Sequence, residues 1–248
     1  MGQNDKKAPI ARDFRSFRES SGPLRIVIAG GGTGGHLFPG IAMAQEFMAR
    51  NSNNRLLFVG TGKPFETTAL SKANFIHQRI TSEGIKGRGL WNQAKSILKI
   101  PKGIFESVMI LKRFRPDLVL GVGGYSAGPL LVGAWLLGIK IVLHEQNVLP
   151  GITNRILSRL ADRVYVSFDD IPTGLSPKKV LYTGNPVRRE ILQYPKNQKG
   201  FGIDDSEQKQ HFVILIIGGS QGAHSINMAL LEAIEKIKDK DKFFFIHQ

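Results

Sequence analysis

The sequence predicts an α/β fold in which helices cover a parallel sheet. Three observations predict it. Short runs rich in Val, Ile and Leu recur along the chain, segments of helical length separate them, and glycine-rich turns follow several of the runs. Continuous apolar runs are typical of parallel strands that are buried on both faces. Their alternation with helices indicates repeated βα units that share one sheet.

Seven runs before residue 193 fit buried strands, because each is rich in β-branched and other large apolar residues. In chain order they are 24–29, 56–59, 75–79, 118–122, 140–144, 163–166 and 179–182. The segments of helical length and composition are 41–50, 91–114 with an interruption at Pro101, 129–137 and 152–160. We therefore expect a Rossmann-like domain that contains these strands.

Composition divides the chain into regions. Residues 1–22 mix charges of both signs without an apolar stretch, which predicts a mobile tail rather than a secretory signal. Residues 23–193 form the N-terminal domain, and the polar residues 194–210 are expected to be a linker. Residues 211–248 begin a second domain, in which a strand, a glycine turn, a helix and a further strand follow one another.

The second domain is expected to be incomplete. About 37 residues are too few to enclose a hydrophobic core of their own. Either the chain is a fragment of a longer two-domain protein, or its second domain packs on something else.

Positive charge is concentrated in the first half of the chain. There are 34 Lys and Arg residues against 20 Asp and Glu, which gives a formal net charge of +14. Half of this charge lies between Gly84 and Arg115, and such a patch predicts an anionic partner. No apolar run reaches the ~18 residues of a membrane-spanning helix. The lack of cysteine excludes disulfides and thiolate metal sites, and we expect no metal site of another kind.

The basic segment predicts contact with an anionic membrane surface. Lys95, Lys99 and Lys102 are interleaved with apolar residues, most of which are expected to face the sheet. Trp91 and Ile104 are expected to stay exposed among the lysines and to enter the bilayer. Binding to nucleic acid is the other reading of a sequence pI near 10.1. We expect none, because the segment contains no nucleic-acid recognition motif.

The first strand runs into a glycine-rich turn, residues 30–36, and Pro39 is expected to open the next helix. Glycines let the backbone approach a ligand, and a helix N-terminus favours an anion such as phosphate. The turn also matches the G-x-G-x-x-G motif of dinucleotide-binding proteins. That motif requires an acidic residue at the end of the second strand, where this chain has residues 60–62, Gly-Thr-Gly. An NAD-dependent oxidoreductase is therefore disfavoured.

Other strand ends also carry glycine or polar groups. They are residues 121–129, 144–147, 184–188 and 218–222. In open parallel sheets, ligands bind along the edge formed by the carboxyl ends of the strands. His36 lies in the glycine-rich turn after the first strand, and histidine is the residue type whose side chain most often transfers protons near neutral pH. Two roles stay open for it, namely general base and a group that binds or orients the ligand.

Five motifs of this sequence resemble the MurG family of bacterial glycosyltransferases. They are residues 31–39, 123–125, 144–147, 184–188 and 218–223, and the resemblance extends from about residue 25 to residue 248. It implies a fold of the GT-B type, with two Rossmann-like domains. It also implies inverting transfer of N-acetylglucosamine from UDP-N-acetylglucosamine to the 4-hydroxyl of the undecaprenyl-diphosphate-linked muramyl pentapeptide, in peptidoglycan synthesis. No metal or other cofactor is expected, and the enzyme would be peripheral on the cytoplasmic face of the plasma membrane.

The resemblance also assigns roles to individual residues. The candidates for catalysis are His36 and Glu145. The expected acceptor-binding residues are Thr33, Gly34, Gly35, Gly124, Tyr125 and Asn147, and the expected donor-binding residues are Asn185, Arg188, Ser220, Gln221 and Gly222.

This chain departs from the family at two points. Ala127 stands where the family usually has serine. The family's second domain continues beyond the equivalent of Gln248, with the segments that hold uracil, ribose and the donor sugar. An alternative function is therefore a non-catalytic module that binds a lipid diphosphate or a membrane.

Overall fold

The structure, a computed structural model, describes residues 22–84, 96, 98–170, 174–193, 211–219 and 222–247. The chain divides into two compact units, Met1–Leu192 and Gln193–Gln248. The predicted tail, apart from Gly22, and the predicted linker lie outside the described residues.

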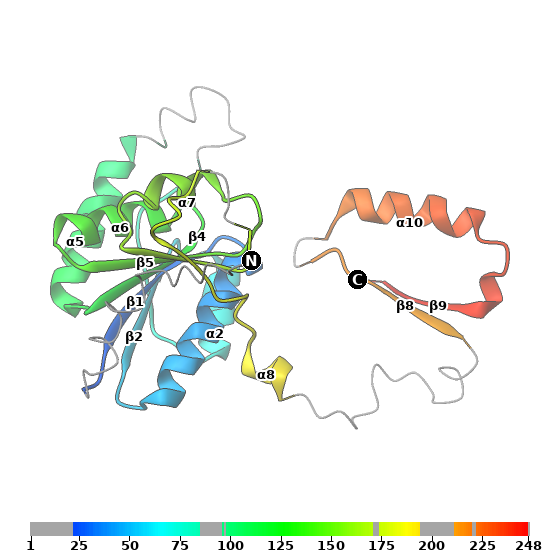
Figure 1. The fold of residues 1–248 in the computed structure, drawn as a ribbon, viewed down its shortest axis with the longest axis horizontal. Coiled ribbons are helices and arrows are strands. Elements are labelled where there is room, and N and C mark those ends of the chain that lie inside the picture. The colour runs from blue at the N-terminus through cyan, green and yellow to red at the C-terminus, as the bar shows by residue number, and fades with distance from the viewer. Residues whose placement is uncertain are drawn as a thin grey trace, which may run out of the picture. The chain divides into compact units, whose positions relative to one another are not determined.

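The first unit is built on a sheet of seven parallel strands in the order β3-β2-β1-β4-β5-β6-β7 (Figure 1). The strands are β1 (Arg25–Gly30), β2 (Arg55–Gly60), β3 (His77–Arg79), β4 (Leu118–Gly123), β5 (Lys140–Glu145), β6 (Arg163–Val166) and β7 (Val180–Tyr182). Each of the seven predicted runs overlaps one of these strands, so the predicted parallel sheet is confirmed. From β1 to β3 the chain adds strands on one side of β1, and from β4 to β7 it adds them on the other side. The direction in which the sheet is built therefore reverses between β1 and β4.

The helices of the first unit differ in part from the prediction. They are α2 (Gly34–Arg50), α3 (Pro64–Lys72), α5 (Ile100–Phe114), α6 (Ala127–Leu136), α7 (Ile152–Leu157) and the short α8 (Arg189–Leu192). Helix α2 begins at Gly34, so Pro39 lies inside it and does not open it. Pro101 lies in the first turn of α5, where proline is tolerated. The predicted interruption at Pro101 therefore lies at the start of this helix and does not break it. Helices α3 and α8 were not predicted.

The sheet is buried on both faces because its strands alternate between two hydrophobic clusters. Ile26 and Ile28 belong to one cluster, and Val27 and Ala29 belong to the other. Successive side chains of a strand point to opposite faces, so a continuous apolar run fills both. The edge strands β3 and β7 depart from this pattern, since every residue of both is half-buried or exposed. The prediction that these two strands are buried on both faces is wrong, because each lies at an edge of the sheet with a neighbour on one side only.

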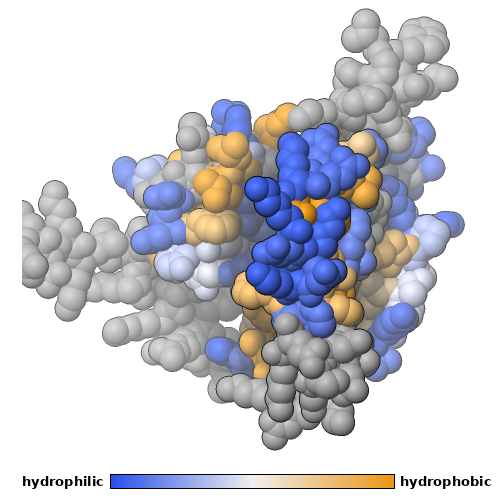
Figure 2. Space-filling model, turned by 90° about the vertical axis from the view of Figure 1, so that its right-hand side faces the viewer, coloured by the Kyte–Doolittle hydropathy of each residue, from blue (hydrophilic) through white to orange (hydrophobic). Residues whose placement is uncertain are grey.

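The second unit contains β8 (Phe212–Ile216), α10 (His224–Lys236), a short 3-10 turn (Lys240–Lys242) and β9 (Phe243–His247). The two strands pair in parallel, and the strand, glycine turn and helix follow one another as predicted. Several of its large apolar side chains are exposed, including Phe212 and Leu231. Figure 2 shows one face of the molecule on which hydrophobic side chains lie between hydrophilic ones.

No helix in the described part of the chain is long and apolar enough to cross a membrane.

Candidate functional site

The two glycine turns that follow β1 and β4 pack backbone against backbone. A Cβ atom on Gly124 would lie 2.5 Å from the carbonyl oxygen of Gly31, and one on Gly30 would lie 2.8 Å from that of Gly123. Only glycine permits contacts this close. The turns therefore meet where β1 and β4 lie side by side, which is the point at which the winding of the sheet reverses. Ligands of open α/β sheets bind in the crevice at such a point.

A buried carboxylate, that of Glu66 in α3, holds the first glycine turn in place. One of its oxygens accepts hydrogen bonds from the backbone N–H of Gly32 at 2.6 Å and the hydroxyl of Thr61 at 2.9 Å. The other accepts from the N–H groups of Thr61 and Gly62, both at 2.9 Å. Glu66 is 2% exposed. The sequence analysis missed this residue, although an acidic side chain four residues after a Gly-Thr-Gly turn was a signal that could have indicated it.

The N-terminus of α2 presents free backbone donors at this crevice. Thr33 precedes the helix in an extended conformation, and its side chain makes no capping hydrogen bond. The N–H groups of Gly34 and Gly35 come first in the helix, so they have no acceptor within it. The first turn of the 17-residue helix contains no acidic residue, and its dipole favours a negative charge at this end. The turn is therefore suited to a phosphate or diphosphate group.

His36 lies in the first turn of α2, where its half-buried ring is held against the second glycine turn. A Cβ on Gly123 would lie 2.7 Å from the Nδ1 atom of this ring. That Nδ1 is 3.3 Å from the side-chain oxygen of Gln146, which follows β5. The amide nitrogen of Gln146 donates to the carbonyl of Val122 at 3.0 Å and lies 3.1 Å from Nδ1 of His144. The Nε2 atom of His144 is 3.3 Å from the carbonyl of Gly184.

Tyr125 also lies against the first glycine turn. A Cβ on Gly32 would be 3.4 Å from its ring, and the ammonium of Lys63 lies 5.4 Å from the ring centroid. The hydroxyl of Ser82 donates to the backbone carbonyl of Tyr125 at 3.0 Å. The predicted acceptor-side residues Thr33, Gly34, Gly35, Gly124 and Tyr125 therefore come from two turns that the structure brings together.

Glu145 is buried, and its carboxylate is occupied by four hydrogen bonds. It accepts from the backbone and side-chain amides of Asn147, both at 3.0 Å. It also accepts from the N–H of Gly151 at 3.2 Å and the side chain of Asn154 at 2.9 Å. Only 1% of Glu145 is exposed, whereas Asn147 is exposed. Glu145 therefore holds the loop that presents Asn147. The predicted catalytic role of Glu145 stays a prediction.

Arg188 reaches the same helix from the end of the first unit. Its guanidinium lies 4.1 Å from the centroid of the Phe38 ring in α2. The segment is held there by Gln45, which accepts from the N–H of Arg189 at 3.2 Å and donates to Glu190 at 2.6 Å. Asn185 is exposed, and its side chain accepts from Ser167 at 3.3 Å.

The donor-side residues of the second unit are only partly described. Gly222 has a φ of 69°, and its N–H donates to the carbonyl of Gly219 at 3.0 Å. Ser220 and Gln221 lie outside the described residues. The donor-binding roles of these three residues therefore stay predictions.

The basic segment differs from the prediction in which apolar side chains it exposes. Lys99 and Lys102 are exposed, but Ile104 is half-buried, so the expectation that it stays exposed is wrong. The inner face of α5 consists of Gly103, Ser107 and Leu111, and Ile104 flanks it. Phe105 and Met109 lie on the outer face, and they are exposed instead. Trp91 and Lys95 lie outside the described residues.

Burial of His144 makes the stability of the fold depend on pH. Desolvation lowers the pKa of His144 below its ordinary value of 6.5, although the carbonyl of Gly184 and the charge of Glu145 act in the opposite direction. As pH falls through about 6.5, the unfolded chain takes up a proton at His144 and the folded chain does not. The free energy of unfolding should then fall by up to about 1.4 kcal/mol per pH unit until the folded pKa is reached.

Urea unfolding of the wild-type chain and of His144→Asn, at a series of pH values between about 5 and 7.5, measures this contribution. The wild-type chain should lose more stability than the variant across that range. Equal slopes in the two proteins would contradict the prediction.

Comparisons with known proteins place the chain among glycosyltransferases. Residues 26–166 match the sequence profile of the glycosyltransferase family 28 N-terminal domain. The chain is 45% identical over 226 residues to a UDP-N-acetylglucosamine–N-acetylmuramyl-(pentapeptide) pyrophosphoryl-undecaprenol N-acetylglucosamine transferase of Geobacter sulfurreducens, covering 91% of this chain and 61% of the relative. A protein of the same name from Syntrophus aciditrophicus is 46% identical over 211 residues, with coverages of 85% and 56%. The chain thus spans about 60% of the length of these curated relatives.

The crystal structure of Acinetobacter baumannii MurG matches the fold with a TM-score of 0.64 at 29% identity. The match covers 91% of this chain and 58% of that protein. Together with the parallel sheet, it confirms the predicted α/β architecture of the GT-B type.

Proposed function

The chain belongs to glycosyltransferase family 28, and on that premise we propose that the protein transfers N-acetylglucosamine from UDP-N-acetylglucosamine to the 4-hydroxyl of undecaprenyl-diphosphate-linked muramyl pentapeptide. This reaction converts lipid I into lipid II in peptidoglycan synthesis. The observation that carries the proposal is the meeting of two glycine turns at the N-terminus of α2, with the His36 ring held against them. The curated relatives that bear the name of this activity support it.

In the proposed mechanism the acceptor diphosphate binds at the two glycine turns. The exposed Thr33, the N–H groups of Gly34 and Gly35, and Asn147 are the groups that would hold it. Their donors are fixed before the ligand arrives, because Glu66 holds the first turn and Glu145 holds the loop of Asn147. Such preorganised donors stabilise negative charge at no further cost in ordering.

Transfer requires a base for the acceptor hydroxyl and stabilisation of the leaving diphosphate. We assign the base to His36, which takes the proton as the hydroxyl oxygen attacks the anomeric carbon and the bond to UDP breaks. Arg188, together with Asn185, Ser220, Gln221 and Gly222, is assigned to the donor diphosphate. No metal or other cofactor is required by this proposal, because fixed dipoles and the guanidinium balance the charge of departing UDP.

A transfer assay with labelled UDP-N-acetylglucosamine and a lipid-linked muramyl pentapeptide tests this function. Formation of labelled lipid supports the proposal. Binding of the lipid diphosphate without transfer would overturn it for this chain and support the alternative, a non-catalytic module that binds a lipid diphosphate or a membrane.

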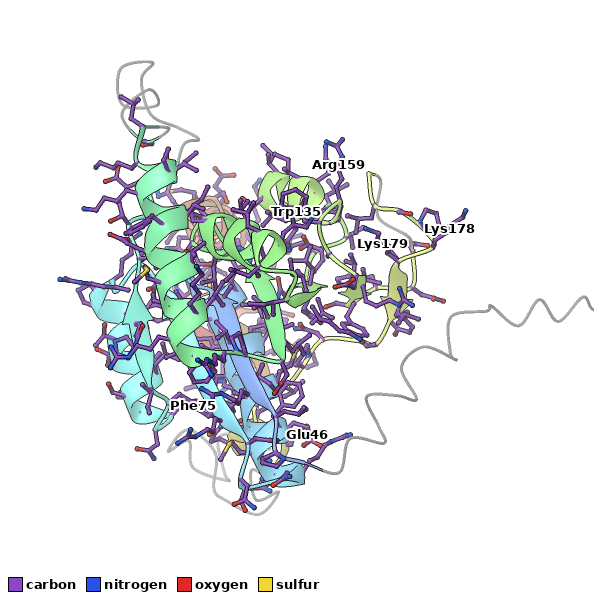
Figure 3. All side chains as sticks on the ribbon, turned by 90° about the vertical axis from the view of Figure 1, so that its left-hand side faces the viewer. Glu46, Phe75, Trp135, Arg159, Lys178 and Lys179 are labelled. Atoms are coloured by element: carbon purple, nitrogen blue, oxygen red, sulfur yellow. The ribbon has the colours of Figure 1, made fainter. Side chains whose placement is uncertain are left out.

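We also propose that the enzyme works as a peripheral protein on the cytoplasmic face of the plasma membrane. Exposed Phe105 and Met109 of α5 lie on the same helix as Lys102, and Trp135 of α6, which packs against α5, is 55% exposed (Figure 3). Exposed aromatic and aliphatic side chains beside lysines fit an anionic bilayer surface. A nucleic-acid partner is not part of this proposal.

Charge reversal should release the protein from anionic vesicles. Changing Lys95, Lys99 and Lys102 together to Glu is expected to weaken binding at least about 100-fold, since each basic group near such a surface contributes about 1 kcal/mol. Vesicle sedimentation with and without anionic lipid measures the effect. The matched control changes Lys236, Lys240 and Lys242, all exposed in the second unit, to Glu. Equal losses in the two triple variants, or equal binding of the wild type to neutral vesicles, would contradict the assignment.

A further inference from the structure

A continuous row of hydrogen bonds joins the ends of four strands, β1, β4, β5 and β7, at the crevice. It begins at the carbonyl of Gly184, after β7, and passes through His144 at the end of β5 to Gln146. From Gln146 one branch ends on the carbonyl of Val122 in β4, and the other ends on Nδ1 of His36 after β1. The proposed function uses His36 but assigns nothing to His144 or Gln146.

The two backbone carbonyls determine the direction of every bond in this row. A carbonyl oxygen only accepts, so the group of Gln146 that faces Val122 must be its NH2, and the side-chain oxygen must face His36. The Nε2 atom of His144 must likewise carry the hydrogen that it donates to Gly184. In a neutral ring Nδ1 of His144 is then an acceptor, and it receives the second N–H of the Gln146 amide.

Burial supports the neutral state of His144 on which this assignment depends. The residue is 1% exposed, and desolvation lowers its pKa. A protonated ring would present a donor to the NH2 of Gln146, and turning the amide over would place its oxygen against the carbonyl of Val122. The neutral arrangement leaves every one of these groups paired.

The titratable groups beside the row are few among the described residues. Glu145 is adjacent to His144 in β5, but its carboxylate is held by Asn147, Gly151 and Asn154. Tyr165 pairs in register with His144 from β6, and burial raises its pKa, so it is neutral near pH 7. Neither group competes with Gln146 for the ring of His36.

We propose that Gln146 and His144 are positioning residues, which hold His36 in the tautomer with hydrogen on Nδ1 and the free electron pair on Nε2. This inference rests on the proposed function, in which Nε2 accepts the proton of the acceptor hydroxyl. The hydrogen bond made by one ring nitrogen sets the state of the other, and the Nδ1–H form is the minor tautomer of free histidine in water. The row therefore reverses the intrinsic preference of the ring and makes the base available at Nε2.

Nitrogen NMR of the chain with ¹⁵N-labelled histidine tests the proposal without reference to catalysis. The chain contains six histidines, and His36→Asn and His144→Asn identify the two signals of interest. At a pH where both rings of the wild type are neutral, hydrogen should lie on Nδ1 of His36 and on Nε2 of His144. A His36 ring with hydrogen on Nε2 would overturn the proposal.

Two substitutions of Gln146 separate its hydrogen bonding from its volume. Gln146→Met keeps the length of the side chain but removes its donors and acceptor, so the Nε2–H form of His36 should become dominant. Gln146→Glu keeps an oxygen that can accept from Nδ1–H, so His36 should retain that hydrogen. Gln78→Met, the same change on the exposed edge strand β3, is the matched control and should alter neither signal. Retention of Nδ1–H in Gln146→Met would overturn the proposal, and the spectrum of the wild type remains decisive if a variant does not fold.

Kinetics then connect the tautomer to the proposed reaction. In protein that transfers sugar, Gln146→Met should lower kcat by about 10- to 100-fold with little change in the KM for UDP-N-acetylglucosamine, because it shifts the base His36 to the tautomer without a free electron pair on Nε2 and removes no donor contact. An unchanged kcat together with a shifted tautomer would overturn the catalytic part. Absence of transfer in the wild type would instead overturn the proposed function, while the NMR spectra still decide the tautomer.

Discussion

Replacing His36 by alanine is expected to lower the rate of sugar transfer by about 10²-fold or more, the usual effect of losing a general base. The ring lies in the first turn of α2, beside the N–H groups of Gly34 and Gly35 that are assigned to the acceptor diphosphate. Its Nδ1 is engaged by Gln146, which leaves Nε2 for the acceptor hydroxyl. The loss should fall on kcat, because the base acts in the transition state and contributes little to binding of the donor.

Steady-state transfer at saturating UDP-N-acetylglucosamine measures this loss. His77→Ala is the matched control, because His77 lies on the edge strand β3 and has no part in the hydrogen-bonded row. It should retain nearly the full rate. A rate near that of the wild type in His36→Ala would remove His36 from the mechanism, and a rise in KM for the acceptor with kcat unchanged would assign it to binding instead.

Glu66→Gln is expected to lower the free energy of unfolding by about 2–3 kcal/mol, although it changes few atoms. Both carboxylate oxygens of Glu66 accept hydrogen bonds, one from Gly32 and Thr61 and the other from the backbone of Thr61 and Gly62. A glutamine has a single oxygen, so its NH2 must face one of the two pairs of partly buried donors. Donors left unpaired in the interior cost about 1–3 kcal/mol each, and hydrogen bonds to a charged group are stronger than neutral ones.

Denaturant unfolding of the two proteins measures the difference. Glu46→Gln is the matched control, because the side chain of Glu46 is 54% exposed and forms a surface ion pair with Arg50 (Figure 3). Its cost should be below about 1 kcal/mol. If Glu66→Gln lowered the free energy of unfolding no more than the control does, the carboxylate would not be what holds the first glycine turn. Glu66→Gln should also weaken the binding of phosphate at that turn.

Most of the first unit could be predicted from local pattern. Its strands are continuous apolar runs, and such runs are visible over five or six residues without knowledge of their neighbours. Helix α3 was missed because only Phe65, Ala69 and Leu70 give it an apolar face, and its remaining residues are polar or proline. The start of α2 was misplaced because Gly34 and Gly35 have poor helix propensity. Tertiary contacts stabilise the helix at these positions all the same.

The candidate site was predicted in part. The glycine turns and His36 have a sequence signal, because few structures require so many glycines together. Glu66 had only the weak signal of an acidic residue after a Gly-Thr-Gly turn. The roles of His144 and Gln146 have no local signal, because their hydrogen-bond partners lie on distant strands. Ile104 was misjudged for a related reason. Which face of α5 turns inward depends on Gly103 and Ser107, which are small polar or neutral residues that a hydrophobicity pattern overlooks.

The sequence by itself determined that this protein alternates buried strands with helices and that glycine-rich turns follow several of the strands. These properties depend on residues near one another in the chain. The tertiary structure decided which turns meet. The strand order places β1 beside β4 and β4 beside β5, so His36 reaches a glutamine 110 residues away. Pairing between distant strands depends on how all the hydrophobic faces are buried together, and no local stretch of sequence contains that information.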